Sequence, residues 1–287
     1  MTRQEFLKIA AATAVSGSSM ANAQEQNIRP RTPADDGFTD TPMQPAEVGP
    51  WHVHDPNRPH PKQITPASTP GGPPSDAIVL FDGKDLSQWY HRGRGANQGK
   101  QVDAGWKVEN GYFEITRGFG DLLTREKFGD VQLHVEWSSP TAIDANSQGR
   151  GNSGVLLMTL YEIQVLDMWD NPTYADGGAG AIYGQWPPLE TPAKRPGEWN
   201  VYDIVFEAPQ FNGDQLAKPA FFTVFYNGVM VHNRKQSLGP MVYRQVAHYR
   251  PQPAEDSLML QDHNSNPVRY RNIWIRRLAG YDQPQKA

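Results

Sequence analysis

From residue 75 onward, short apolar runs are separated by polar turn residues. The clearest run is 130–138, where apolar and polar residues alternate strictly from Val131 to Trp137. Successive side chains of a strand point to opposite faces, so this period of two predicts a strand with one buried face. Similar runs predict strands at 77–81, 105–109, 111–116, 121–124, 153–158, 161–167, 180–183, 199–207, 221–226, 229–232, 257–263 and 268–278.

The connections between these runs favour antiparallel pairing. Asn110-Gly111 and Asn227-Gly228 each stand between two strand-like runs, and Asn-Gly is the preferred dipeptide of two-residue hairpin turns. Only 85–89 shows any helical apolar period. Many short strands joined by tight turns predict an all-β fold, either a sandwich or a jelly roll.

The stretch 24–74 differs from the rest of the chain. It contains twelve prolines and few aliphatic residues, so it buries too little apolar area to offset the entropy of ordering. We expect an extended, proline-rich lead. The predicted organisation is therefore a lead over 24–74, a β-sandwich domain over 75–280 and a short tail over 281–287.

The first residues have the features of an export signal. Arg3 and Lys8 make the start basic, a weakly apolar segment follows, and an A-x-A cleavage site ends at Ala23. We therefore expect 1–23 to be a signal peptide and the protein to be periplasmic or extracellular. The start also resembles a twin-arginine signal with Gln4 in place of the second arginine, which leaves the export pathway open.

Composition narrows the class of partner. The net charge is -4 and no basic stripe is visible, which argues against nucleic acid. The chain has no cysteine, so disulfides, thiolate catalysis and a lipidated cysteine are excluded. No apolar run reaches roughly 18 residues, so no membrane-spanning helix is expected.

The strand at 161–167 carries the first candidate chemistry. Its apolar residues share one face, and Glu162 and Gln164 share the other. If the apolar face is core, these two polar side chains stand together on the open face, where a rigid strand can position them for a site. Asp167 reaches that face only through a bulge or as the first loop residue. A solvated outer face explains the same pattern without function.

A second polar cluster lies in 260–275. His263 has several polar neighbours and can act as a general base, because the ordinary pKa of histidine is near neutrality. A structural histidine is an equally open interpretation. Arg271 shares its alternation with Ile273 and Ile275, and an arginine on an apolar face is usually a buried, hydrogen-bonded charge or an anion clamp.

Three further side chains are candidates for contact with a ligand. Asn152 and Asn200 each begin a strand-like run beside a glycine-containing turn, and glycine lets the backbone approach a ligand closely. Tyr183 offers an aromatic face for stacking on a sugar ring. Core or rim packing is the alternative for this tyrosine.

The chain lacks the carboxylate pair of an ordinary retaining glycosidase. Such enzymes need two carboxyl groups about 5–5.5 Å apart, which concanavalin-like glucanases supply from one strand as E-x-D-x-E. Here Glu162 is followed at those positions by Gln164 and Leu166. Two-carboxylate hydrolysis is therefore disfavoured.

The chain resembles the 3-keto-disaccharide hydrolase family, formerly a domain of unknown function, from about Ile78 to Leu278. Two features depart from the family pattern, namely Met158 where many relatives carry arginine and a turn lengthened by 264–266. The resemblance rests on these motifs: LFDGKDLSQW (80–89), WKVENGYFEI (106–115), GNSGVLLM (151–158), YEIQVLD (161–167), AGAIYGQWPP (179–188), GEWNVYDI (197–204), NGVMVHN (227–233) and LQDHNSNPVRYRNIWI (260–275).

The resemblance implies a concanavalin A-like jelly-roll β-sandwich and a hydrolase or lyase for small 3-keto glycosides, which the predicted signal peptide would export. A ketone at C3 acidifies the C2 hydrogen, so a base removes it, the C1 oxygen leaves, and water adds back. We expect Glu162 or His263 to be the base. Whether a metal is needed stays open, although a bound divalent metal ion is a suitable electrophile. The expected substrate-binding residues are Asn152, Gln164, Asp167, Tyr183, Asn200 and Arg271.

Two other classes of protein stay open. A non-catalytic, lectin-like carbohydrate-binding module can use the same sandwich, because a fold does not determine a function. A structural or interaction domain is the third possibility. The enzyme hypothesis requires Glu162, Gln164 and His263 to line one concave pocket.

Overall fold

The computed structural model describes residues 36–264 and 266–282. The predicted signal peptide, the first part of the lead and the last five residues of the tail lie outside the described residues. The chain divides into two compact units, Met1–His60 and Pro61–Ala287.

Within the first unit, the proline-rich stretch forms turns and is not uniformly extended. Met43 and His52 form an antiparallel bridge, and the N–H of Phe38 donates to the carbonyl of His54 at 2.8 Å. The Asp55 carboxylate accepts from the backbone N–H groups of His52 at 3.0 Å and of Asn57 at 2.9 Å. Backbone and side-chain hydrogen bonds therefore order this short segment without an apolar core.

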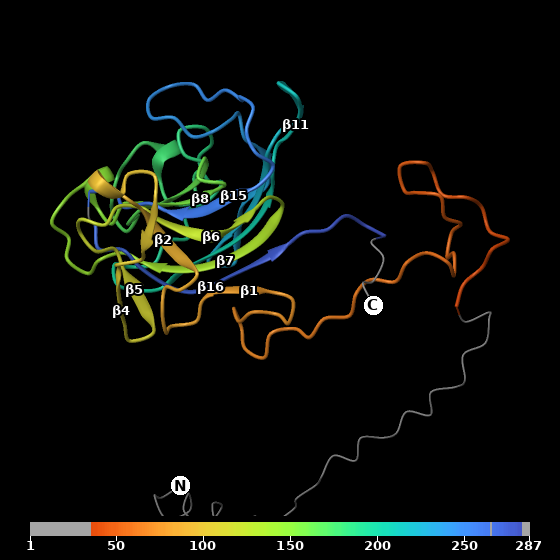
Figure 1. Cartoon of the computed structure of the whole chain (residues 1–287), viewed down its shortest axis with the longest axis horizontal. Helices are drawn as coiled ribbons and strands as arrows, with labels where there is room; N and C mark the ends of the chain where they lie inside the picture. The colour runs from red at the N-terminus through yellow and green to blue at the C-terminus, as the bar shows by residue number, and fades with distance from the viewer. Residues whose placement is uncertain (1–35, 265, 283–287) are drawn as a thin grey trace, which may run out of the picture. The chain divides into compact units, whose positions relative to one another are not determined.

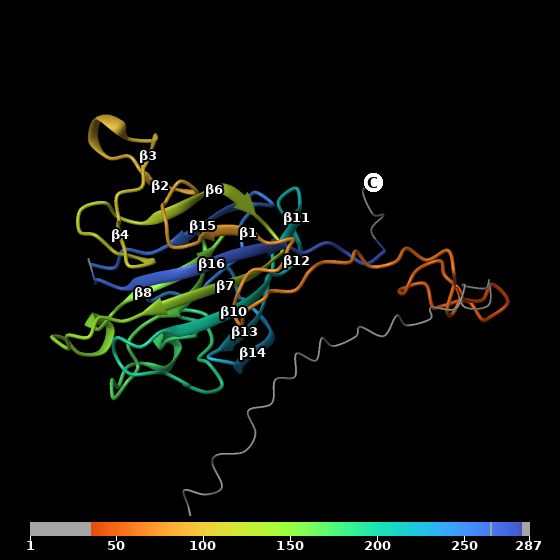
Figure 2. The same cartoon turned by 90° about the horizontal axis from the view of Figure 1, so that it is seen from below.

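The second unit is built on two antiparallel sheets packed face to face (Figure 1). Figure 2 shows the strands of the larger sheet side by side. In spatial order these are β14 (Val229–Gln236), β13 (Phe221–Tyr226), β10 (Asn200–Glu207), β7 (Val131–Ser138), β16 (Arg269–Arg277), β5 (Tyr112–Glu114) and β4 (Lys107–Glu109), with β1 (Ile78–Phe81) also paired to β16.

The second sheet has six strands, and a separate two-stranded ribbon completes the β structure. The order in the second sheet is β3 (Gln101–Asp103), β2 (Trp89–Arg92), β6 (Leu122–Phe128), β15 (Asp256–Leu260), β8 (Ser153–Leu157) and β9 (Tyr161–Val165). The ribbon pairs β11 (Gln210–Asn212) with β12 (Gln215–Lys218). The described helices are the 3-10 turns η2 (Gly95–Asn97), η3 (Ser147–Gly149) and η4 (Ala175–Gly177). The predicted all-β jelly-roll sandwich is confirmed.

The strand predictions fail where the alternation of apolar and polar residues is weak. Strands β2, β3, β11 and β12 were not expected, because their short runs mix polar residues without a clear period of two. The segment 85–89 forms a turn that leads into β2 and no helix. The expected strand 180–183 is reduced to isolated bridges at Ile182.

The core lies between the sheets and is rich in aromatic side chains. Along β10, buried and half-buried residues alternate, as a two-layer sandwich requires. Trp137, Tyr202 and Tyr226 form a buried aromatic group with ring centroids 5.0–6.1 Å apart. The Tyr202 hydroxyl donates to the carbonyl of Gln164 at 2.7 Å, which ties the larger sheet to β9.

A bulge in β16 reverses the expected direction of Arg271. The register with β7 shifts between Arg271 and Trp274, and Asn272 has a left-handed φ of 44°. The extra residue places Ile273 and Ile275 in the core and turns Arg271 outward. The expectation that Arg271 shares a face with these isoleucines is therefore wrong.

The last part of the proline-rich stretch packs on the outer face of the larger sheet. The carbonyl of Gly71 accepts from Trp274 Nε1 at 2.9 Å and from Asn272 Nδ2 at 2.8 Å. Asp76 pairs with Arg276 at 2.7 Å. Residues from 61 onward thus belong to the sandwich unit. No helix in the described part of the chain has the length and apolar character needed to cross a membrane.

Candidate functional site

The six-stranded sheet carries a cavity of about 500 Å³ on the face that points away from the core. Strand β9 supplies Glu162 and Gln164, whose neighbours Ile163 and Val165 are fully buried in the core. Gln261, which the sequence placed in a strand over 257–263, also lines this polar cavity and directly follows β15. The other walls come from residues that the strand pattern did not select, namely Gln148 of η3 and Tyr174, Met241, Tyr243 and Asn264 of loops.

Five of the eight residues expected from the sequence line this polar cavity. They are Asn152, Glu162, Gln164, Tyr183 and His263. They come from β9 and from three loops, one of which leads directly into β8, so segments more than one hundred residues apart converge on one concave site. The condition that the enzyme hypothesis placed on the fold is met, while the role of each residue stays a prediction.

Glu162 is the most strongly perturbed acid of the cavity. Its side chain is only 2% exposed, and no described residue donates a hydrogen bond to its carboxyl group. Burial, with a smaller contribution from the Asp121 carboxylate, raises the pKa of Glu162 to about 8. The group is therefore a protonated acid at neutral pH. The neighbouring Gly154 makes room for it, because a Cβ there would lie 2.3 Å from Glu162 Oε1.

Gln164 belongs to a network of amides on the cavity wall. Its Nε2 donates to Gln148 Oε1 at 3.1 Å and to the carbonyl of Gly177 at 3.2 Å. Asn152 Nδ2 donates to the carbonyl of Gln148 at 2.7 Å. The buried Oε1 of Gln164 has no hydrogen-bond partner within the described residues, which is uncommon for a buried polar atom.

His263 follows the end of β15 and is half-buried. Burial lowers the pKa of His263, so its imidazole is neutral near pH 7. Asn264 Nδ2 lies 3.4 Å from its Nδ1, and Asn266 Nδ2 donates to its carbonyl at 2.7 Å. The lengthened turn thus holds the backbone of this histidine.

The tyrosines of the site come from two connections between strands, since Tyr174 and Tyr183 both lie in 166–199, between β9 and β10. Tyr174 and Tyr183 have their hydroxyl oxygens 3.1 Å apart, and Tyr243 belongs to the long connection 237–255 between β14 and β15. The sequence analysis missed Tyr174, Tyr243 and Gln148 because loops lack periodicity. The length of 237–255 was the available signal, since structureless connections beyond roughly 15 residues are often functional.

Asp167 does not line the polar cavity. Its Oδ2 accepts from Arg150 Nε at 3.0 Å and from Arg150 Nη2 at 2.5 Å, and its Oδ1 accepts from the N–H of Trp169 at 2.9 Å. Both partners of the ion pair are more than nine-tenths buried. Asp167 lines a different cavity, of about 330 Å³, together with Arg150. Its carboxylate oxygens are already engaged by the hydrogen bonds of this ion pair and of the Trp169 N–H.

Arg271 and Asn200 also lie away from the polar cavity. Arg271 pairs with Glu136 at 2.6 Å and lies 4.2 Å above the Trp199 ring, on the outer face of the larger sheet. Asn200 Oδ1 accepts from the N–H of Lys194 at 3.2 Å and from Asn227 Nδ2 at 2.9 Å. Their direct contact with a ligand in this cavity is therefore not supported.

The residues of the cavity do not form an evident metal centre. Over 36–264 and 266–282, no group of three or more His, Asp or Glu side chains is placed to hold a metal ion. The cavity combines one carboxyl group and one imidazole, from Glu162 and His263, with amides and tyrosines.

Fold and cavity together define a jelly-roll β-sandwich with a polar site on one sheet. Within that class, the chain belongs to the family described as 3-keto-alpha-glucoside-1,2-lyase-like domain, whose family model matches residues 76–276. None of the curated proteins matches the chain.

Solved structures agree with this assignment. A "putative glycosyl hydrolase" from Parabacteroides distasonis is 40% identical, with a TM-score of 0.71 over 83% of this chain and 100% of the other. A second structure of that name and organism is 21% identical, with a TM-score of 0.50 over 71% of this chain and 94% of the other. The second likeness concerns the fold alone.

Proposed function

We propose that the protein is a glycoside-processing hydrolase that cleaves 3-keto glycosides by elimination and rehydration. Family membership and the 40% identical structure support glycoside processing in general. The finer proposal depends on one observation: Glu162 and His263 line the same cavity with pKa values shifted in opposite directions. Such a pair separates into an acid and a base at neutral pH.

The elimination step uses both groups. The neutral imidazole of His263 removes the proton at C2, which the C3 ketone has acidified, and the electron pair forms an enolate. As the C1–O bond breaks, the pair becomes the C1–C2 double bond and the leaving oxygen takes the proton of Glu162. The products are an unsaturated 3-keto sugar and a free alcohol.

Rehydration uses the same groups in reverse. The Glu162 carboxylate takes a proton from water as the water oxygen bonds to C1, and the imidazolium of His263 returns a proton to C2. The sum of the two steps is hydrolysis, without a second carboxylate. This accounts for an amide, Gln164, at the position where a glucanase carries its middle acid.

The remaining polar groups have binding roles in this proposal. The free acceptor of Gln164 receives a hydrogen bond from a sugar hydroxyl. Burial raises the pKa of Tyr183 well above its usual range, so its hydroxyl stays protonated and can donate to the enolate oxygen. Asn152 holds the Gln148 backbone that borders the site.

Turnover of methyl 3-keto-α-glucoside by Glu162→Gln and His263→Ala tests the proposal. Each variant should lose about 10²–10⁴-fold in kcat, the usual contribution of a positioned acid or base. In D₂O, Glu162→Gln should still exchange the C2 hydrogen, whereas His263→Ala should not, because only the base acts on that proton.

The exposed Glu190 supplies the matched control, and Glu190→Gln should keep full activity. Unchanged kcat in both site variants would overturn the assignment of acid and base. A wild-type protein that binds the glycoside without turnover would be a lectin-like module, which contradicts the proposal.

A further inference from the structure

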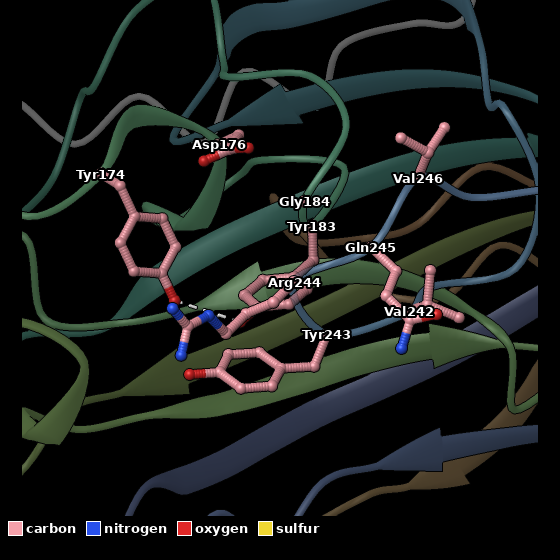
Figure 3. Close-up of a pocket in the computed structure, with 9 residues that line it drawn as sticks. All are labelled: Tyr174, Asp176, Tyr183, Gly184, Val242, Tyr243, Arg244, Gln245 and Val246. Atoms are coloured by element: carbon pink, nitrogen blue, oxygen red, sulfur yellow. Dashed lines mark hydrogen bonds between the residues drawn. The ribbon is translucent and has the colours of Figure 1, made fainter.

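A second cavity of about 650 Å³ adjoins the polar cavity. Tyr174, Tyr183 and Tyr243 belong to the walls of both cavities. Figure 3 shows these tyrosines grouped on one side, with the valines on the other. This outer cavity is completed by Asp176, Gly184, Val242, Arg244, Gln245 and Val246.

We propose that the outer cavity binds the leaving group of the glycoside and selects a planar, apolar and uncharged aglycone. The inference rests on the proposed function, since it places the sugar in the polar cavity. Two adjoining cavities that share a wall of three tyrosines fit a ligand of two chemically different parts. In a glycoside these two parts are the sugar and the aglycone, which is attached through the C1 oxygen.

The apolar surface of the outer cavity indicates an apolar ligand. Tyr243 is 65% exposed and Val246 is 69% exposed, so both leave apolar area in water. Covering such area is favourable in proportion to its size. Tyrosine rings also favour planar partners, which they can meet by stacking or edge-to-face contact.

The charges of the outer cavity do not select an ion. Asp176 and Arg244 both line the outer cavity and carry opposite charges, so the net charge of the lining favours neither an anionic nor a cationic aglycone. The guanidinium of Arg244 lies 5.9 Å from the Tyr243 ring. A neutral ring therefore fits the site better than a charged group.

The segment 242–246, which forms part of the wall of the outer cavity, is anchored through the residues 238–241 that precede it. The N–H of Met241 donates to the carbonyl of Leu160 at 2.7 Å. Gln185 Nε2 donates to the carbonyl of Gly239 at 3.0 Å, and its Oε1 accepts from the N–H of Leu238 at 2.6 Å. A wall that is already ordered loses little entropy when a ligand binds.

Benzyl and methyl 3-keto-α-glucosides test the inference, because they differ in the ring and share an alkyl leaving oxygen. The wild-type KM should be at least about tenfold lower for the benzyl glycoside. Val246→Ser should reduce the ratio of the methyl KM to the benzyl KM several-fold. The side chain of Val246 is exposed enough for the variant to fold. Leu189→Ser is the matched control, because Leu189 is 68% exposed and lines neither cavity. In this variant the ratio of the two KM values should equal that of the wild type.

The outcomes separate the two proposals. Equal KM values for the two glycosides, with turnover of both, would overturn the aglycone site and leave the proposed function standing. A lower KM for a 3-keto disaccharide than for the benzyl glycoside would assign the outer cavity to a second sugar and overturn the inference. Turnover of none of them would overturn the proposed function itself.

Discussion

Glu162 and His263 share one cavity, and burial disfavours the charged form of both. Burial raises the pKa of Glu162 to about 8, so its carboxyl group is protonated at neutral pH. Burial also lowers the pKa of His263, so its imidazole is neutral at the same pH. We expect kcat/KM to fall as the pH rises through about 8, because Glu162 loses the proton that it must donate. It should also fall in acid, where His263 becomes protonated.

The pH profile of kcat/KM for methyl 3-keto-α-glucoside measures both limbs. In Glu162→Gln the residual activity should lose the alkaline limb and keep the acid limb. An alkaline limb that persists unchanged in that variant would assign it to another group.

The space for the Glu162 carboxyl depends on Gly154. An alanine Cβ at this position would lie 2.3 Å from Glu162 Oε1, so Gly154→Ala should displace the acid. We expect a loss of about 1–3 kcal/mol in the free energy of unfolding and about 10-fold or more in kcat. Urea unfolding and kinetics measure the two effects.

The double variant Gly154→Ala/Glu162→Ala is the control, since it removes the conflicting carboxyl group. Its loss of unfolding free energy should be smaller than the sum of the losses in Gly154→Ala and Glu162→Ala. Additive losses would show that the alanine conflicts with something other than Glu162.

At the scale of elements, a buried histidine of β7, His134, contacts side chains of the neighbouring strands β10 and β16. His134 is 2% exposed, lies 2.6 Å from Asp203 and 3.6 Å from Glu136, and stacks on Trp274 at 5.2 Å. Burial alone lowers the pKa of His134, but the hydrogen bonds with the two carboxylates raise it to about 9. The same strands carry Arg271, which pairs with Glu136.

A pKa that is higher in the folded protein than in the unfolded chain stabilises the fold at low pH. The contribution of His134 is complete below the unfolded value of 6.5 and is lost as the pH rises to about 9. The rise in the pKa of His134 from 6.5 to about 9 corresponds to an upper limit of about 3.4 kcal/mol. Solvent screening at the half-exposed Asp203 makes the actual contribution smaller. His134→Phe keeps a ring against Trp274 and should flatten this part of the stability profile.

Urea unfolding between pH 6 and 9 measures the difference between wild type and His134→Phe. The difference is the relevant quantity, because the raised pKa of Glu162 destabilises the wild type in the same direction as the pH rises. Equal slopes in the two proteins would show that His134 is not the responsible group.

At the scale of the whole molecule, residues 61–77 are part of the sandwich unit. Gly71 accepts two hydrogen bonds from β16, and Asp76 pairs with Arg276 of the same strand. Relative to a chain of residues 61–287, a chain that begins at residue 78 should lose about 3 kcal/mol of unfolding free energy, at about 1 kcal/mol per lost interaction. Equal urea midpoints for the two chains would contradict this packing.

The sequence alone determined what depends on local geometry. Alternation in β9 placed Glu162 and Gln164 on one face and Ile163 on the other, because side-chain direction in a strand repeats every two residues. The same rule, together with the Asn-Gly turns, determined the all-β class. The predicted export signal lies outside the described residues and stays a prediction.

Only the tertiary structure decided what depends on distant contacts. The bulge at Asn272 turned the side chain of Arg271 to the outer face of the sheet. Asp167 forms a buried ion pair with Arg150 instead of facing the polar cavity. The loops that carry Gln148 and Tyr243 closed the cavity over β9. The perturbed acidity of Glu162 follows from that closure, because desolvation depends on every segment that excludes water from the carboxyl group and not on its own strand.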